Sequence, residues 1–417
     1  MHPFLWRFAM AALVALPACA HTRAQTLAQR TGPLTLSAAR TLAQSANPAI
    51  IAAIHELDAA GGAAMQAGAR PNPELSVLVE DTRSATRATT LQLNQAIELG
   101  GKRDARINVA GRAREQAEAA LAAARADTGA AVALAFDELL AAQDALALTV
   151  ATRTVAARTG AVADQRVAAG KASPVEATRA RIGAAEAEAA LAQAEALVQS
   201  SRRRLAATWG ASAPSFDRAE GTLALSGAMP DIAVLQRRLE NAPRLVQLRS
   251  ELDRRGALLT LERARRTPDI TLSAGVKRDA QLGRDQAVFG VAVPLPLFDR
   301  NAGNVMEAAS RAARARDDID AARVDATVAL MQAHEAWLLA GRQAALYRDE
   351  IVPAAQSAFE ATSTGFAFGK FAFLDVLDAQ RTLIDAASRQ LRAGLDARRA
   401  MADIERLTGV PLTESQP

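Results

Sequence analysis

The chain has 417 residues, and half of them are apolar although only 4% are aromatic. Alanine supplies much of the apolar fraction, which favours long helices that pack closely side by side over a globule with a bulky core. The formal net charge is only +4, with acidic and basic residues interspersed, so the composition argues against a nucleic-acid-binding protein.

Residues 1–24 are typical of a signal peptide, because Arg7 precedes an apolar run at 8–16 that is too short to span a bilayer. Residues 18–20 and 22–24 both resemble ordinary cleavage sites, whereas residues 16–19 resemble a bacterial lipobox that would leave Cys19 lipidated. Cys19 is the only cysteine, so no intrachain disulfide can form. The few histidines form no cluster, and the sequence predicts neither a dedicated metal site nor a cofactor.

The rest of the chain reads as one unit that occurs twice. The first copy, at 34–210, has a helical pattern at 36–68, strands at 73–81 and 88–99, and helices at 103–167 and 173–208. The second copy, at 230–410, repeats this order at 231–266, 269–278, 286–297, 302–367 and 371–408. Residues 211–229 form a linker, and residues 411–417 form a short tail.

Matching short segments support the duplication. Asn47-Pro48 corresponds to Asn241-Ala-Pro243, and Ala169-Gly-Lys171 corresponds to Phe368-Gly-Lys370, at a separation of about 194 to 199 positions. The helix at 103–167 contains no proline and would be about 95 Å long, which no globular domain requires. Its counterpart contains Pro353, which should kink it.

The strands alternate apolar and polar residues. About ten residues in a tilted strand cover the ~25 Å apolar band of an outer-membrane barrel, although a soluble four-stranded sheet covered by helices would show the same alternation. Four strands cannot close a barrel, so several chains would have to associate; two copies would supply eight strands and three would supply twelve, which suits a polar lumen better. The side chains expected to face lipid are Leu75, Val77, Val79, Leu91, Leu93, Ile97, Ile270, Leu272, Phe289, Val291 and Val293.

This pattern resembles the outer membrane factor family of TolC-like channels over about residues 34–410. Two segments, Ile97-Glu-Leu-Gly-Gly-Lys-Arg103 and Val293-Pro-Leu-Pro-Leu-Phe-Asp-Arg-Asn301, resemble the CzcC-like branch that serves heavy-metal exporters. The resemblance implies a mainly α-helical homotrimer in the outer membrane of a Gram-negative cell. Its twelve-stranded β-barrel would continue as a long helical barrel through the periplasm, towards a periplasmic adaptor and an inner-membrane RND pump.

The same resemblance assigns roles to the two helix–turn–helix tips, although their glycines would also serve simply to end helices. The residues implied to contact the adaptor are Arg166, Gly170, Lys171, Ser173, Pro174, Gly369, Lys370 and Phe371. Asp375 and Asp378 are three apart on one helix face, and the resemblance implies that they form acidic rings at the narrow end of the pore. An ordinary solvated helix start would carry such acids too. The first repeat has Glu176 and Arg179 at the equivalent positions.

No sequence motif of a common enzyme class occurs in a suitable context, so the chain is not expected to be an enzyme. The exported substrate is barely encoded, which leaves drug efflux and type I protein secretion as alternatives to heavy-metal export. A non-channel periplasmic adaptor or scaffold built from coiled coils is the remaining alternative. Adaptors use long hairpins as well, but they do not combine a duplicated hairpin with four lipid-length strands.

Overall fold

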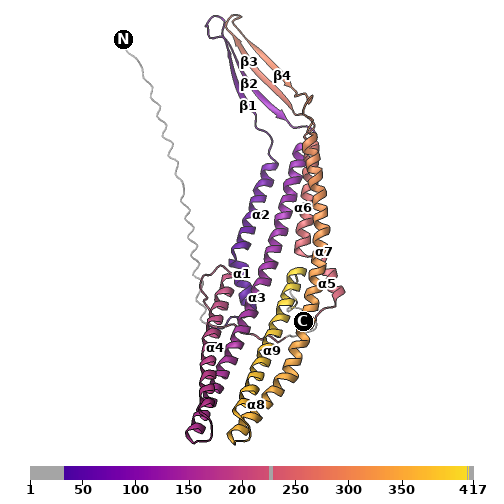
Figure 1. Cartoon of the computed structure of the whole chain (residues 1–417). Coiled ribbons are helices and arrows are strands. Elements are labelled where there is room, and N and C mark those ends of the chain that lie inside the picture. Colours follow the sequence, from indigo (N-terminus) through magenta and orange to yellow (C-terminus); the bar gives the residue numbers. More distant parts are fainter. Residues whose placement is uncertain (1–31, 225–228, 411, 413–417) are drawn as a thin grey trace, which may run out of the picture.

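The computed structural model of the chain describes residues 32–224, 229–410 and 412. The predicted signal peptide, Cys19 and most of the predicted tail lie outside these residues. The molecule is elongated, with a four-stranded sheet at one end and the two hairpin turns at the other (Figure 1). Within the described ranges, no helix combines the length and the apolar character that a bilayer crossing requires.

Both repeats have the same order of elements. The first contains α1 (Leu36–Ala46), α2 (Pro48–Ala67), β1 (Glu74–Glu80), β2 (Ala88–Ile97), α3 (Lys102–Ala168) and α4 (Pro174–Ala207). The second contains α5 (Ile232–Leu239), α6 (Pro243–Ala264), β3 (Ile270–Asp279), β4 (Arg284–Ala292), α7 (Ala302–Leu346), a π turn (Tyr347–Ile351), α8 (Val352–Ala367) and α9 (Phe373–Thr408). The mainly helical, duplicated architecture predicted from the sequence is therefore confirmed.

The predicted helix at 36–68 is wrong in one respect, because it breaks at Asn47. This residue is extended, as a residue before proline prefers to be, and its Oδ1 accepts hydrogen bonds from the N–H groups of Ala49 (2.8 Å) and Ile50 (3.2 Å). The predicted helix at 231–266 also breaks before Pro243, although here α5 ends at Leu239 and Ala242, the residue before the proline, has no side chain that could cap α6. In each repeat a proline thus begins a new helix where the apolar pattern alone suggested a continuous one.

Each repeat contains one long helical segment, called a rod from here on, and the two rods differ. α3 runs without interruption for 67 residues, which is about 100 Å at the rise of an α-helix. The second rod is divided into α7 and α8 by the π turn at Tyr347–Ile351, which ends two residues before Pro353. A proline lacks the N–H that continues the helical ladder, and the extra residue of a π turn accommodates that loss. The predicted disturbance at Pro353 therefore takes the form of a local change in helical pitch.

The sheet is antiparallel throughout, in the order β1-β2-β3-β4, so that the pair β2–β3 joins the two repeats. Its register places the predicted apolar side chains on one face. One row across this face is Leu75, Leu93, Ala274 and Phe289, and the next is Val77, Leu91, Val276 and Ala287. The predicted strand at 286–297 is too long, because β4 ends at Ala292 where β3 begins, and Val293 lies one residue beyond it.

The opposite face of the sheet is mainly polar, apart from Leu78 and Val288, and its polar side chains form hydrogen bonds with one another. Asn94 of β2 accepts at its Oδ1 from Ser273 Oγ (2.7 Å) and Gln92 Nε2 (2.9 Å), and its Nδ2 donates to Ser76 Oγ (3.2 Å). Lys277 and Glu80 form an ion pair further along the same face. The sheet is therefore amphipathic across its thickness, which suits a wall with water on one side only.

The linker between the repeats is packed against the helices. Phe216, Ala219 and Leu223 are buried with Phe136 and Leu139 of α3. Leu34 N–H donates to the carbonyl of Arg218 (2.9 Å), and its own carbonyl accepts from Glu220 N–H (2.8 Å). This core lies halfway along the molecule, where α1 also packs against α3 (Figure 1).

Candidate functional site

The first tip, between α3 and α4, is built from turn-forming residues. Gly170 has φ of +69°, and the N–H of Lys171 closes the turn on the carbonyl of Arg166 (2.8 Å). Ser173 then caps α4 by accepting from Val175 N–H (3.2 Å), and Pro174 occupies the first position of that helix. The side chain of Lys171 is exposed at the end of the molecule.

The second tip has the same design. Gly369 has φ of +74°, and the N–H of Lys370 bonds to the carbonyl of Gly365 (2.8 Å). The ring of Phe371 lies against Gly365, in the space that any larger side chain at 365 would need. Lys370 is exposed, and Phe371 is 44% exposed. Both tips therefore present a lysine beside a glycine that turns the chain.

Arg166 does not point away from the molecule. Its Nη1 donates to the carbonyl of Phe366 (3.0 Å), and its guanidinium lies 4.4 Å from the centroid of the Phe366 ring. Phe366 packs in turn on Phe373, with ring centroids 5.8 Å apart, in a small core that also holds Val376. The two tips of one chain are thus joined by an aromatic core and by a cation from the first hairpin.

This joint was not predicted from the sequence. A usable signal was present, since four of the eleven phenylalanines of the chain fall between residues 366 and 373. Such a concentration of aromatic residues in an aromatic-poor chain indicates a local packing site. Which residues they would contact was not accessible, because Arg166 and Phe366 are far apart in the sequence and meet only in the folded chain.

Asp375 and Asp378 lie on the first turns of α9, and both are exposed. Asp375 has a local role, because its Oδ2 accepts the N–H of Ala372 (2.8 Å) and so caps the helix. Asp378 is free of that role and borders a hollow of about 630 Å³ between α3, α4 and α9. Arg179, which replaces the second acid in the first repeat, borders the same hollow.

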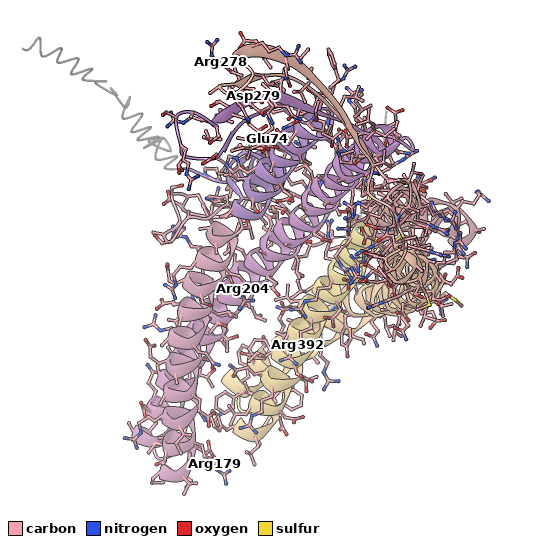
Figure 2. The ribbon with its side chains drawn as sticks, turned by 90° about the horizontal axis from the view of Figure 1, so that it is seen from above. Glu74, Arg179, Arg204, Arg278, Asp279 and Arg392 are labelled. Atoms are coloured by element: carbon pink, nitrogen blue, oxygen red, sulfur yellow. The ribbon has the colours of Figure 1, made fainter. Side chains whose placement is uncertain are left out.

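This hollow continues towards the middle of the molecule. A second one, of about 440 Å³, shares Thr152, Ala190 and Ile384 with the first, so the two form one groove along α3 between α4 and α9. Figure 2 shows Arg179 and Arg204 on the α4 side and Arg392 on the α9 side. Glu138, inside the groove, pairs with Arg204 (2.6 Å) and with Arg399 (3.2 Å).

A buried charged cluster lies deeper in the same region. Asp137 of α3 is only 6% exposed, and this burial raises its pKa from 3.8 to about 6, although Arg398 and Arg40 oppose the shift. Glu405 of α9, which is 8% exposed, pairs with Arg40 of α1 (3.1 Å). The cluster connects α1, α3 and α9 and therefore ties the second repeat to the first. No group of three or more His, Cys, Asp or Glu side chains suited to a metal occurs among the described residues.

The side chains predicted to face lipid are mostly solvent-exposed in the single chain. Phe289 is 82% exposed, Val291 69% and Leu75 65%, whereas Ile270 is half-buried. Leu78, which the alternation placed among polar residues, is 57% exposed on the other face beside Thr90. An apolar surface that spans four strands without any cover is unusual for a protein in water.

Comparison with known proteins agrees with this architecture. Residues 39–211 and 234–410 both match the family described as outer membrane efflux protein. The chain is 46% identical over 381 residues to the cobalt-zinc-cadmium resistance protein CzcC of Cupriavidus metallidurans, covering 91% of each chain. It is also 30% identical to the nickel-cobalt-cadmium resistance protein NccC of Alcaligenes xylosoxydans xylosoxydans, over 65% of this chain and 63% of that protein.

Among solved structures, the chain is similar to the MtrE outer membrane channel of Neisseria gonorrhoeae. The TM-score is 0.77 at 19% identity, and the alignment covers 92% of this chain and 91% of MtrE. The amphipathic sheet, the duplicated rods and these matches lead to one conclusion: the chain belongs to the outer membrane efflux protein family.

Proposed function

We propose that three copies of this chain form the outer-membrane conduit of a tripartite system that exports heavy-metal cations. The observation that carries this proposal is the 46% identity, over nearly the whole chain, to a protein named for cobalt, zinc and cadmium resistance. Each repeat, 34–210 and 230–410, contributes two strands and one rod to the wall. Three chains then supply twelve strands, enough to enclose a water-filled lumen.

The polar and apolar faces of the sheet give the wall its orientation. The face with Phe289 and Leu75 contacts lipid, and the face with Asn94 and Ser273 contacts water. The rods extend this lumen through the periplasm to the tips, where Lys171 and Lys370 meet an adaptor protein that connects the conduit to an inner-membrane RND pump. Rings of Asp375 and Asp378 at this end favour the passage of cations.

The experiment is a deletion of this gene in its own host, followed by growth on graded cobalt, zinc and cadmium. Because the conduit completes the export route, we expect the deletion strain to become sensitive to at least one of these ions. The gene supplied on a plasmid restores tolerance. Unchanged tolerance to all three ions, together with sensitivity to organic drugs or loss of a secreted protein, would assign the conduit to another pump.

A further inference from the structure

The sheet of a single chain has two free edges, β1 on one side and β4 on the other. In a membrane, the unpaired N–H and C=O groups of an edge strand are strongly unfavourable, so each edge needs a partner. If the chains associate as in the proposed function, on which this inference rests, β4 of one chain must meet β1 of the next. The duplication makes it possible to derive how these two strands align.

Two pairs of landmarks relate the repeats. Pro48 and Pro243 begin α2 and α6, so residues before the sheet correspond at a separation of 195 positions. Gly101 and Asn301 precede α3 and α7, both in the left-handed conformation, so residues after the sheet correspond at a separation of 200 positions. β1 therefore corresponds to β3 by the first separation, and β2 to β4 by the second.

The observed hairpins check this correspondence independently. In the first hairpin Ser76 pairs with Gln92, and the two separations map this pair onto Thr271 and Ala292. The second hairpin indeed pairs Thr271 with Ala292. The pair Leu78–Thr90 maps in the same way onto the observed pair Ser273–Gly290. The two hairpins thus share one register, and the separations of 195 and 200 positions describe it.

The contact between the repeats, β2 against β3, is the template for the contact between chains. We propose that β4 continues to Leu297 and pairs with β1 of the next subunit in the register that β2 adopts on β3. The observed pairs Leu93–Ala274, Gln95–Leu272 and Ile97–Ile270 become pairs between subunits. These are Val293 with Val79, Leu295 with Val77, and Leu297 with Leu75.

The side chains suit this arrangement. All six residues are apolar, and each is exposed in the single chain, from 44% for Val293 to 73% for Leu295. They are odd-numbered, as are Phe289 and Val291, so they extend the apolar face of the sheet across the boundary between subunits. The apparent overlength of the predicted strand at 286–297 then has a physical reason, because its last residues find their partner only on another chain.

The two prolines in the segment fit the same register. Ala280 N–H donates to the carbonyl of Arg87 (2.9 Å), so odd-numbered residues of β2 direct their backbone groups towards β3. By correspondence, odd-numbered residues of β4 direct theirs towards the next subunit. Pro294 and Pro296 are even-numbered and face the side where β3 has already ended, so their missing N–H groups cost no bond. In the single chain, Leu297 N–H donates to the carbonyl of Leu295 (2.9 Å). On assembly, this bond would be replaced by one to the backbone of Leu75 in the next subunit.

Charged residues at the end of the sheet next to the long helices also correspond between the two repeats. Within the chain, Asp269 accepts from Leu99 N–H (3.0 Å) and pairs with Lys102 (2.7 Å). The residue equivalent to Asp269 is Glu74, which is also acidic and is exposed. The equivalent of Lys102 is Ala302, but a base appears two positions earlier, at Arg300, and it is exposed as well. The register brings Arg300 to Glu74 of the next subunit.

Cysteine cross-linking tests the register directly. Gln92 pairs with Gly275 within the chain, so Ala292 should lie opposite Glu80 of the next subunit in a non-hydrogen-bonded pair, where side chains are closest. In the variant with Ala292→Cys and Glu80→Cys, oxidation in outer membranes should convert most of the protein into covalent dimers and trimers on a denaturing gel. The two single-cysteine variants are controls for the native Cys19 and should remain single chains.

Shifted pairs give the opposing outcomes. Ala292→Cys combined with Leu78→Cys or with Thr82→Cys places the thiols on the same face but two residues out of register, about 7–8 Å apart, too far for a disulfide. Stronger cross-linking in a shifted pair than in the Ala292/Glu80 pair would overturn the register while leaving the trimeric conduit intact. A trimer that cross-links in none of the pairs would overturn it as well. Purification as a single chain would refute the proposed function itself.

Discussion

Asp375 and Asp378 follow the second tip on adjacent turns of one helix, but their surroundings differ. Asp375 is engaged with the backbone of Ala372, whereas Asp378 faces a hollow that it shares with Arg179. A ring of three copies of each residue would hold up to six negative charges at the end of the lumen, which attracts cations. The first repeat has one acid, Glu176, and one base, Arg179, at these positions. If the proposed rings form, the cation selectivity of the pore would therefore depend on the second tip.

The double variant Asp375→Asn with Asp378→Asn should therefore reduce the preference for cations over anions severalfold. The measurement is the reversal potential of the purified channel in a planar bilayer under a salt gradient. Glu176→Gln, at the equivalent position of the first tip, is the matched control and should change the reversal potential little. An unaltered preference in the double variant would exclude both aspartates from the narrow part of the pore.

Asp137 makes the stability of the molecule depend on pH. Its pKa in the folded chain is about 6, above the 3.8 of an exposed aspartate, because burial disfavours the charged form. Its contribution to the free energy of unfolding is thus fully present below pH 3.8 and is lost as the pH rises through 6. Relative to the wild type, Asp137→Asn should gain stability between pH 4 and pH 7, by up to about 3 kcal/mol.

Thermal unfolding in detergent at a series of pH values measures this difference. Asp164→Asn, an exposed position on the same helix, is the control and should follow the wild-type curve. If the Asp137→Asn and wild-type curves ran parallel from pH 4 to pH 8, Asp137 would not be the group responsible. Arg40, Arg398 and Glu405 surround Asp137 and remain in both proteins.

At the scale of elements, the joint between the hairpin tips determines how firmly the second tip is held. Arg166 contributes one hydrogen bond and one cation–π contact to Phe366, together about 1–2 kcal/mol. Arg166→Ala should therefore release the second tip and raise the rate of tryptic cleavage after Lys370 about tenfold. Arg179→Ala removes a nearby cation without touching Phe366 and should leave this rate unchanged. Equal rates for all three proteins would mean that the joint does not restrain the tip.

The elements themselves were largely predictable from the sequence. Strands and helices follow local sequence patterns, namely alternation of apolar residues, helical runs without proline, and glycines at helix ends. The strand around Leu91 and the helix ends at Gly170 and Gly369 could therefore be predicted from neighbouring residues alone. The breaks before Pro48 and Pro243 were visible as helix starts, but the surrounding apolar pattern suggested continuity. The end of β4 at Ala292 was not predictable, because a strand ends where its partner strand ends, and the alternation of apolar residues continues beyond Ala292 although its pairing with β3 does not.

Contacts between segments that are far apart in the chain could not be predicted from the sequence either. The bond from Arg166 to Phe366 and the burial of Asp137 beside Glu405 depend on how the repeats pack together, which no local pattern encodes. Arg166 was therefore expected to point to a partner protein, and the structure turns it towards the chain's own second tip. The predicted aperture, by contrast, depended on two residues one turn apart, which helical geometry alone places on one face.

At the scale of the whole molecule, one chain is an incomplete wall. Its sheet has an uncovered apolar face and two free edges, and an open sheet with such edges is not viable in lipid. Three chains, as proposed, would remove both problems at once by closing the strands into a cylinder that encloses the polar face. Every functional role proposed for the tips, the aperture and the lumen follows from this closure.

The most direct test is native mass spectrometry of the protein extracted from outer membranes in mild detergent. We expect one dominant species whose mass is three times that of the mature chain. A dominant single chain, recovered from the soluble periplasmic fraction, would contradict it.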